Sequence, residues 1–340
     1  MLGVIIVTYN SSDVITACLE RLVASNGVDL RIVVCDNASQ DDTVETIRAW
    51  ARDRTDGLVE LTEVDDMTTE PQVALLRAPV NRGFAAGVNM GLRYLMRDSR
   101  CGLFWILNPD CEVAPDTATA FLHCAAATGD FALMGSRVVY LEPPGLIQSE
   151  GGRVERWTGI CRSVNRGADP AETERHPTAA DLDFIPGASM VATRRFVETA
   201  GPMAEDYFLY YEEVDWAACR GTLALVLCEN ATVYHHGGTS IGTGAVNRLP
   251  TPFSLYFNNR NRMRFLRKHR PIALPTAYLA SLARVGKLAT IGAWPEAQSA
   301  FLGLHQLPPP KRVRERLSPE AADVAFNTWR EQTAWSSDLG

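Results

Sequence analysis

The sequence predicts an α/β fold in which a mostly parallel sheet carries helices on both faces, followed by a C-terminal helical region. An apolar run at 4–7 precedes a helical pattern over 14–23, and a second apolar run at 30–35 precedes a helix over 43–52. The run at 4–7 is continuous and β-branched, which is typical of a strand buried on both faces, and 30–35 is expected to be the second strand. Because this βαβα order joins strands through helical crossovers, the strands are expected to be parallel.

The next elements continue this pattern to residue 130. Strands are predicted at 73–76 and 103–107, a glycine-rich loop leads into a helix over 83–97, and another helix spans about 115–127. The acidic stretch 53–72 lacks a clear period. It is therefore expected to be a loop or a short hairpin around 58–61.

From residue 131 the pattern changes to shorter strands and longer loops. Helices are predicted over 256–268 and 275–288, and a proline run at 308–310 leads to a last helix over 319–335. These changes divide the chain into a first half, a second half of the same domain and a helical region, with the ranges 1–130, 131–245 and 246–340.

Composition excludes several classes of partner. The chain has 340 residues, 46% of them hydrophobic, and a net charge of −7, which argues against general attraction to nucleic acid or anionic membranes. Eight cysteines without a CxxC pair favour reduced thiols, and no apolar run is long enough to cross a bilayer. We therefore expect a cytoplasmic protein in which an anionic ligand needs local help.

Four polar clusters follow predicted strands, at 8–10, 36–39, 81–84 and 108–110. In an open parallel sheet, ligands bind beyond the carboxyl ends of the strands, where such loops converge. Each cluster alone is more typical of turns and helix caps. Their coincidence predicts one binding cleft.

Two clusters offer contacts to a nucleotide. Asp36 is placed to accept hydrogen bonds from a base or a ribose hydroxyl, although it is also a natural N-cap for the following helix. Gly83, Gly87 and Gly91 recur at four-residue intervals, which allows either close helix packing or close approach of the backbone to phosphate. They do not form the dinucleotide pattern GxGxxG.

Asp110 is the candidate metal ligand. It ends a predicted central strand, and a carboxylate there suits Mg²⁺ or Mn²⁺, which would neutralise a diphosphate in an acidic protein. His235 is a candidate third ligand or phosphate contact. The alternatives are a tight turn at 108–110 and a structural role for the histidine.

The aromatic stretch 207–211 leads directly into three carboxylates, Glu212, Glu213 and Asp215. Glu213 is the candidate base, which would take a proton from an attacking hydroxyl. An acid-rich helix N-terminus is the alternative explanation.

Seven segments in this order resemble an inverting family 2 glycosyltransferase of the GT-A fold, within it the bacterial rhamnosyltransferase-like branch. The resemblance spans about 2–270 and rests on VIIVTYN at 4–10, VCDNAS at 34–39, NRGFAAGVN at 81–89, LNPD at 107–110, PGASM at 186–190, YEEVD at 211–215 and HHGGTS at 235–240. It implies a Rossmann-like sheet, Mg²⁺ or Mn²⁺, and a dTDP-, UDP- or GDP-linked sugar donor. It also implies that the half 1–130 binds the nucleotide sugar and the half 131–245 binds the acceptor.

The resemblance also assigns roles to residues. It implies a metal site with Asp110 in the DxD-type motif, and a base at Glu213 or Asp215, because Glu213 stands where aspartate is usual and Asn108 replaces the first acid of DxD. Implied donor contacts are Thr8, Tyr9, Asn10, Asp36, Asn37, Asn81, Gly83, Phe84, Gly87, Asn89 and Asn108. Implied acceptor contacts are Gly187, Ala188, Tyr211 and Glu212.

Further expectations concern the acceptor and location. The resemblance implies transfer of a rhamnose-like or other hexose to a glycan or lipid-linked acceptor in cell-surface polysaccharide or glycoconjugate biosynthesis. Peripheral contact with the inner face of the membrane is one reading of a basic helix, and a solvated helix face is the other; its cations are Arg260, Arg262, Arg264, Arg267, Lys268 and Arg270. Whether the chain forms a homo-oligomer stays open.

Rival functions fit less well. A nucleotide-binding oxidoreductase would want GxGxxG, and a sugar nucleotidyltransferase would want a basic residue in the loop 9–14, which has none. A non-catalytic nucleotide- or sugar-binding module would leave Asp110 and Glu213 without a purpose.

Overall fold

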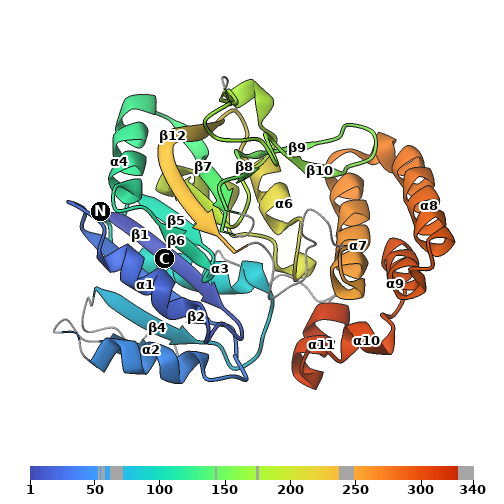
Figure 1. Cartoon of the computed structure of the whole chain (residues 1–340), viewed down its shortest axis with the longest axis horizontal. Coiled ribbons are helices and arrows are strands. Elements are labelled where there is room, and N and C mark those ends of the chain that lie inside the picture. Colours follow the sequence, from blue (N-terminus) through green and yellow to red (C-terminus); the bar gives the residue numbers. More distant parts are fainter. Residues whose placement is uncertain are drawn as a thin grey trace.

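A ten-stranded sheet forms the centre of the protein (Figure 1). The computed structural model describes residues 1–52, 54, 58–61, 72–141, 144–173, 176–236 and 249–327. The strand order is β3-β4-β2-β1-β5-β11-β7-β12-β6, with β8 paired to β7. The strands are β1 (Leu2–Thr8), β2 (Leu30–Asp36), β3 (Leu58–Leu61), β4 (Val73–Arg77), β5 (Leu103–Leu107), β6 (Cys111–Val113), β7 (Phe131–Tyr140), β8 (Ile147–Ser149), β11 (Ser189–Thr193) and β12 (Ala224–His235).

The N-terminal part of the sheet is parallel, as the sequence predicts. β1 lies between β2 and β5 and runs parallel to both, and β2 runs parallel to β4. β11 then lies antiparallel between β5 and β7. The stretch 58–61 differs from the expected loop or hairpin, because it forms an edge strand parallel to β4.

Helices cover both faces of the sheet, which confirms the predicted layers. Ile5 and Val7 of β1 pack with α3 on one face, whereas Val4 and Ile6 pack with α1 and α4 on the other. This alternation is the two-residue period of a strand buried on both sides. The helices of this part are α1 (Ile15–Val23), α2 (Thr43–Arg52), α3 (Phe84–Leu95), α4 (Thr117–Thr128), α5 (Arg194–Ala200) and α6 (Glu212–Ala218).

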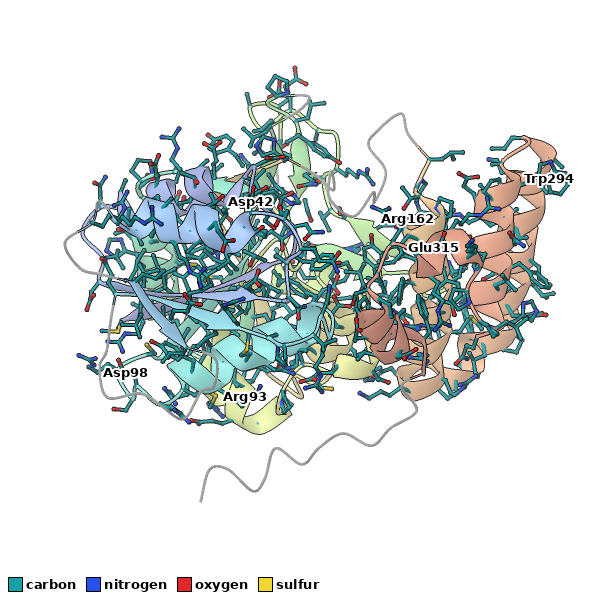
Figure 2. The ribbon with its side chains drawn as sticks, turned by 90° about the horizontal axis from the view of Figure 1, so that it is seen from below. Asp42, Arg93, Asp98, Arg162, Trp294 and Glu315 are labelled. Carbon is teal, nitrogen blue, oxygen red and sulfur yellow. The ribbon has the colours of Figure 1, made fainter. Side chains whose placement is uncertain are left out.

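A C-terminal group of helices stands beside the sheet (Figure 1). It consists of α7 (Pro252–His269), α8 (Leu274–Thr290), α9 (Trp294–Leu304), α10 (Lys311–Arg314) and α11 (Pro319–Asn327). Thr251 caps α7 by accepting from Ser254 N at 3.3 Å, with Pro252 in the first turn. Figure 2 shows Trp294 at the outer end of this group, away from the sheet.

Several predicted boundaries shift. The second half contains two long strands, β7 of 10 residues and β12 of 12, where shorter strands were expected. The sequence gives no prediction for α9. The last helix, expected over 319–335, is described as far as Asn327, and residues 328–340 lie outside the described residues.

The two expected halves share one sheet. β6 comes from the first half but pairs antiparallel with β12 of the second, which places His235 opposite Cys111. The boundary expected at residue 130 therefore falls in the connection between α4 and β7, and β7 belongs to the same sheet as the strands before it. The expected boundary at 245 lies outside the described residues, as does the segment 237–240 of the histidine motif.

The basic run on α7 is only partly exposed. Arg260 and Arg262 are buried, only 2% and 6% exposed. Arg260 donates to Ala325 O and Tyr207 O, and Arg262 donates to Ser281 Oγ. Arg264 and Arg270 are half-buried, and Arg267 and Lys268 are exposed, so two of the six cations of this run belong to the protein interior.

Two other features bear on the expectations from composition. All eight cysteines are free thiols. Among the described residues, no helix is long and apolar enough to span a membrane.

Candidate active site

Asp36 and Asp110 open onto the same edge of the sheet. Asp36 ends β2 opposite Thr8 of β1, and Asp110 follows β5, whose Leu107 lies opposite Ile6 of the same strand β1. The strands are parallel, so their carboxyl ends meet at one edge. The convergence on which a donor cleft depends is therefore present.

The loops after β1 and β2 are tied together. Thr8 Oγ1 donates to Asp36 Oδ1 at 3.1 Å, and Asn10 N donates to Ser39 Oγ at 2.9 Å. Asn10 and Ala38 both adopt the left-handed conformation, with φ of 52° and 61°. Asp36 is 2% exposed, and its other oxygen accepts from Ser39 N. Asp36 therefore lies at the floor of this loop pair.

The third loop, 81–84, is attached through Asn37. Asn37 Nδ2 donates to Gly83 O at 2.9 Å, and Asn37 Oδ1 accepts from Arg82 N at 3.2 Å. Asn81 Oδ1 accepts from Gly83 N, and the Tyr9 hydroxyl hydrogen-bonds Asn81. Burial raises the pKa of Tyr9, although that hydrogen bond opposes the rise. These amides hold three predicted donor segments at fixed distances.

Gly83 brings this loop against the aromatic stretch 207–211. Gly83 has a φ of +91°, and a β-carbon there would lie 2.2 Å from Phe208 O. Phe84 N donates to the same Phe208 O at 2.9 Å. On its other side, the Phe84 ring lies 3.2 Å from where a β-carbon on Gly187 would stand. The predicted donor and acceptor segments are therefore in direct contact.

Two predicted donor residues have contacts inside the protein. A β-carbon on Gly87 would lie 2.5 Å from Val7 Cγ1, which favours the helix-packing alternative for this glycine. Asn89 is 1% exposed; its amide donates to Met203 O and Glu205 Oε1 and accepts from Met203 N. Asn89 thus anchors the segment before the aromatic stretch.

Asp110 faces His235 across the end of the sheet. His235 Nε2 lies 3.1 Å from Asp110 Oδ1, and Asn108 Nδ2 lies 3.4 Å from the same nitrogen. His235 Nδ1 lies 2.7 Å from Gln148 Oε1. Burial would raise the pKa of Asp110, but the hydrogen bond and charge of His235 outweigh it and lower that pKa.

These residues fit a hard divalent cation. Gln148 Oε1 is an acceptor, so the proton of a neutral His235 belongs on Nδ1 and leaves the Nε2 lone pair facing the Asp110 carboxylate. Two acceptors this close need a second proton or a cation between them. Cys111 completes a group whose ligand atoms lie within 4.8 Å, but burial raises its pKa well above the usual value, so the thiol keeps its proton. Asp110 and His235 remain as the candidate ligands.

The segment before the carboxylates is strained. Phe208, Tyr210 and Tyr211 all have positive φ, at 64°, 68° and 75°. For bulky residues this conformation costs about 1–3 kcal/mol each and persists only where surroundings impose it. Asn261 of α7 supplies part of that restraint, because its Nδ2 lies 2.9, 2.7 and 3.0 Å from the carbonyl oxygens of residues 207, 209 and 210.

Glu212 and Glu213 begin α6 directly after this segment. Each has one buried carboxyl oxygen, Oε2, without a hydrogen-bond partner. Burial raises the pKa of Glu213 to about 7, against backbone hydrogen bonds that lower it. Burial and the neighbouring Glu213 raise the pKa of Glu212 well above its usual value. Glu213 is therefore a carboxyl group that exchanges protons near neutral pH.

Asp215 has a different environment. Its Oδ1 accepts from the Tyr207 hydroxyl at 3.0 Å and from His269 Nε2 at 2.7 Å, and its Oδ2 accepts from Lys268 Nζ at 2.8 Å. Burial would raise the pKa of Asp215, but the hydrogen bonds from His269 and Lys268 outweigh it and lower that pKa. An occupied, ionised carboxylate is a poor proton acceptor, so the geometry favours Glu213 as the base.

Sequence reasoning missed the residues that position these groups. Gln148 fixes the His235 ring, and Asn261 holds the strained segment. Gln148 carries no local signal. Asn261 belongs to the stretch Asn258–Arg262, whose three asparagines are poor helix formers inside a long helix, and such a cluster indicates side-chain contacts outside the helix.

A family comparison covers the donor half of this site. The model of glycosyl transferase family 2 matches residues 3–180, more than half of the chain. The chain belongs to glycosyl transferase family 2. It is therefore a glycosyltransferase, and the loops at 8–10, 36–39, 81–84 and 108–110 all lie within the matched range.

Individual relatives agree with this assignment. The chain is 23% identical over 263 residues to the low-salt glycan biosynthesis hexosyltransferase Agl10 of Haloferax volcanii, covering 77% of this chain and 74% of the relative.

Solved glycosyltransferases share the fold. S. aureus TarS 1–349 superposes with a TM-score of 0.53 at 14% identity, covering 96% of this chain and 89% of that one. The mannosyltransferase PcManGT of Pyrobaculum calidifontis, solved with GDP-Man and Mn²⁺, gives 0.51 at 17% identity, covering 96% and 85%. These likenesses confirm the GT-A fold.

Proposed function

We propose that this enzyme transfers a hexose, rhamnose-like or other, from a nucleoside-diphosphate sugar to an acceptor hydroxyl with inversion at the anomeric carbon. The observation that carries the proposal is the environment of Glu213. Its buried Oε2 has no partner, and burial raises its pKa to about 7. A carboxyl group with these properties removes protons efficiently at neutral pH.

The donor lies along the shared sheet edge. Asp36 and the loop pair 8–10 and 36–39 hold the base and ribose, and the backbone of Gly83 and Phe84 borders the sugar diphosphate. Asp110 and His235 hold Mg²⁺ or Mn²⁺, which offsets the negative charge of the departing diphosphate when bound. Two solved fold neighbours support this arrangement, TarS in complex with UDP-GlcNAc and PcManGT in complex with GDP-Man and Mn²⁺. We propose dTDP-sugars as a third class of donor.

The proposed reaction is a single displacement at the anomeric carbon. The acceptor oxygen forms a bond to the anomeric carbon from the face opposite the diphosphate, and the bond from that carbon to the diphosphate oxygen breaks. The acceptor proton passes to Glu213, and the nucleoside diphosphate leaves. Because the strained segment 208–211 fixes the start of α6, Glu213 needs no rearrangement to receive the proton.

The acceptor side is formed by segments that touch this machinery. Ala188 O accepts from Asn108 N at 3.0 Å, and Tyr211 directly precedes α6. We propose that Gly187, Ala188, Tyr211 and Glu212 border the acceptor, which is a glycan or a lipid-linked glycan. The relative Agl10 is a glycan biosynthesis hexosyltransferase, which supports a place for this enzyme in cell-surface glycan assembly.

One experiment tests the proposal directly. The purified chain is heated with UDP, GDP or dTDP, each with Mn²⁺, with Mg²⁺ or with EDTA, and the midpoint of unfolding is measured. We expect one nucleotide to raise the midpoint only when a divalent cation is present, and the matching nucleotide sugar to release that nucleotide. If no nucleotide shifts the midpoint with either metal, the proposal is wrong.

A further inference from the structure

A groove lies between the β9–β10 hairpin, formed by β9 (Gly152–Val154) and β10 (Cys161–Ser163), and the end of α7. Three hollows of about 590, 240 and 410 Å³ open there, and all three share Val154 and Asp183. They therefore form one continuous surface feature. Figure 1 shows β9 and β10 next to α7 and α8, at one end of the sheet.

The groove concentrates positive charge in an acidic protein. Its lining contains five arginines against two carboxylates, although the whole chain has a net charge of −7; the arginines are Arg153, Arg156, Arg162, Arg220 and Arg270. Some of this charge is compensated, because Arg162 pairs with Glu155, Arg153 pairs with Asp181 outside the lining, and Arg270 lies 3.6 Å from Asp183. A positive field confined to one groove attracts a partner that carries negative charge.

Two of these arginines, Arg156 and Arg220, form no salt bridge within the described part of the chain. Arg156 lies over the Trp157 ring at 5.4 Å, and Arg220 donates to Ala217 O. Burial lowers the pKa of Arg220, the charge of Asp183 raises it, and the charge of Arg270 lowers it again. Asp183 thus lies near both Arg220 and Arg270, so a further anion in the groove would reduce the repulsion between these two arginines.

An aromatic side chain stands in the same groove. Trp157 is 49% exposed, and Thr276 Oγ1 donates to Trp157 O at 2.6 Å, which fixes the tip of the hairpin against α8. An exposed aromatic ring on a fixed backbone offers a flat apolar face for stacking against a sugar ring. His269, held through Nε2 by Asp215, lines the groove beside it.

The groove adjoins the proposed reaction centre. Val214 and Ala218 of α6 line it, and Val214 directly follows Glu213 in the chain. Tyr211 donates its hydroxyl to Gly159 O at 2.8 Å, which ties the hairpin to the start of α6. A ligand in the groove would therefore extend away from an acceptor hydroxyl placed at Glu213.

We propose that this groove binds an acidic glycan, the part of the acceptor that lies beyond the reacting hydroxyl. Arg156 and Arg220 pair with its carboxylate or phosphate groups, and Trp157 stacks on one of its rings. That the bound glycan is the acceptor rests on the proposed function, whereas its binding in the groove does not. Arginine with an aromatic ring gives both charge recognition and ring recognition in one site.

The test compares two tetrasaccharides of equal length, tetragalacturonate and neutral maltotetraose, by calorimetry at low salt. We expect tetragalacturonate to bind more tightly and to weaken as salt rises. Arg156→Gln should weaken it by about fivefold, the upper range for one exposed ion pair. Arg312→Gln is the matched control; Arg312 is an exposed arginine on α10, and α10 packs against the opposite end of α7 through Val313.

Trp157 gives a second readout. Trp157→Ala should weaken tetragalacturonate binding, and Trp157→Phe should restore most of it, because phenylalanine keeps a ring for stacking. Equal binding of both tetrasaccharides, or equal effects of Arg156→Gln and Arg312→Gln, would overturn the proposal. So would inorganic phosphate that competes as strongly as the glycan, or binding of anionic vesicles that depends on Arg156 without any glycan binding.

The nucleotide test separates this inference from the proposed function. Both measurements use the same preparation of the full chain. Glycan binding without any nucleotide-dependent stabilisation would overturn the proposed function and leave the groove in place. Nucleotide binding without glycan binding would overturn the groove alone.

Discussion

His235 Nε2 lies 3.1 Å from Asp110 Oδ1, while Gln148 Oε1 lies 2.7 Å from the other ring nitrogen. Since Gln148 directs the Nδ1 proton, Nε2 and Asp110 share either a second proton or a divalent cation. Protons and metal therefore compete for the same position, and metal affinity should fall as pH falls.

Asp110→Ala is expected to abolish metal-dependent turnover of the donor while the fold is retained. The substitution removes the carboxylate that faces His235. Isothermal titration with Mn²⁺ and a nucleotide-release assay measure the two effects. Asp116→Ala is the matched control, because Asp116 is exposed and makes no side-chain capping bond. Wild-type turnover in Asp110→Ala would refute the metal assignment.

Gln148→Ala provides a milder form of the same test. Loss of an outer partner of a metal-binding histidine typically costs 10–100-fold in metal affinity. We expect weaker Mn²⁺ binding that partly recovers at higher metal concentration, with maximal turnover largely preserved. Unchanged Mn²⁺ affinity would show that Gln148 does not orient a ligand.

Glu213→Gln should spare donor binding but remove transfer, because the amide keeps the shape and cannot accept the proton. Asp215→Asn should instead lower stability, since it breaks the ionic contacts with Lys268 and His269. Nucleotide-dependent thermal shifts measure binding, and product formation measures transfer. The base would be Asp215 if Asp215→Asn lost transfer with unchanged stability while Glu213→Gln stayed active.

Acidity should control both rate and stability through Glu213. With a pKa of about 7, the transfer rate should fall as pH drops below 7, because the protonated carboxyl cannot act as base. The pKa of Glu213 in the folded protein lies above its ordinary value of 4.5, so the folded state holds this proton more tightly than the unfolded state does. The resulting contribution to folding stability is complete below pH 4.5 and is lost as pH rises through 7. Glu213→Gln should therefore leave stability unchanged near pH 4 and raise it at pH 8, by roughly 1–3 kcal/mol. Denaturant unfolding at both pH values measures this; destabilisation at pH 8 would contradict it.

Asn261→Ala should lower kcat far more than it lowers stability. Asn261 holds three carbonyl groups of the strained segment, so its loss lets 208–211 relax and displaces Glu213. Asn258→Ala is the matched control on the same helix, since Asn258 bonds only to Ser254 one turn away. Equal kcat in the two variants would show that the segment keeps its shape without Asn261.

The sequence predicted what local patterns encode. β1, β2 and α2 follow from continuous apolar runs and helical spacing, and α2 begins and ends where expected, at Thr43 and Arg52. The meeting of the strand ends at Asp36 and Asp110 follows from parallel topology alone. Periodicity also predicted α7 and α8 to within a few residues.

The rest depends on contacts between distant segments. No local pattern shows that Arg260 and Arg262 are buried, because an arginine looks the same in a sequence whether it faces water or the carbonyl of Tyr207. The difference between Glu213 and Asp215 arises from Lys268 and His269, more than 50 residues away. The strain at Tyr211 is likewise imposed from outside the segment.

The pairing of β6 with β12 makes the metal pair a matter of strand alignment. His235 lies opposite Cys111, the neighbour of Asp110, only because Val233 is aligned with Val113. Side chains alternate between faces, so a slip by one residue would turn the imidazole to the opposite side of the sheet. Deletion of one residue between Ala231 and His235 would thus inactivate the enzyme by shifting this alignment, although Asp110 and His235 would both still be present.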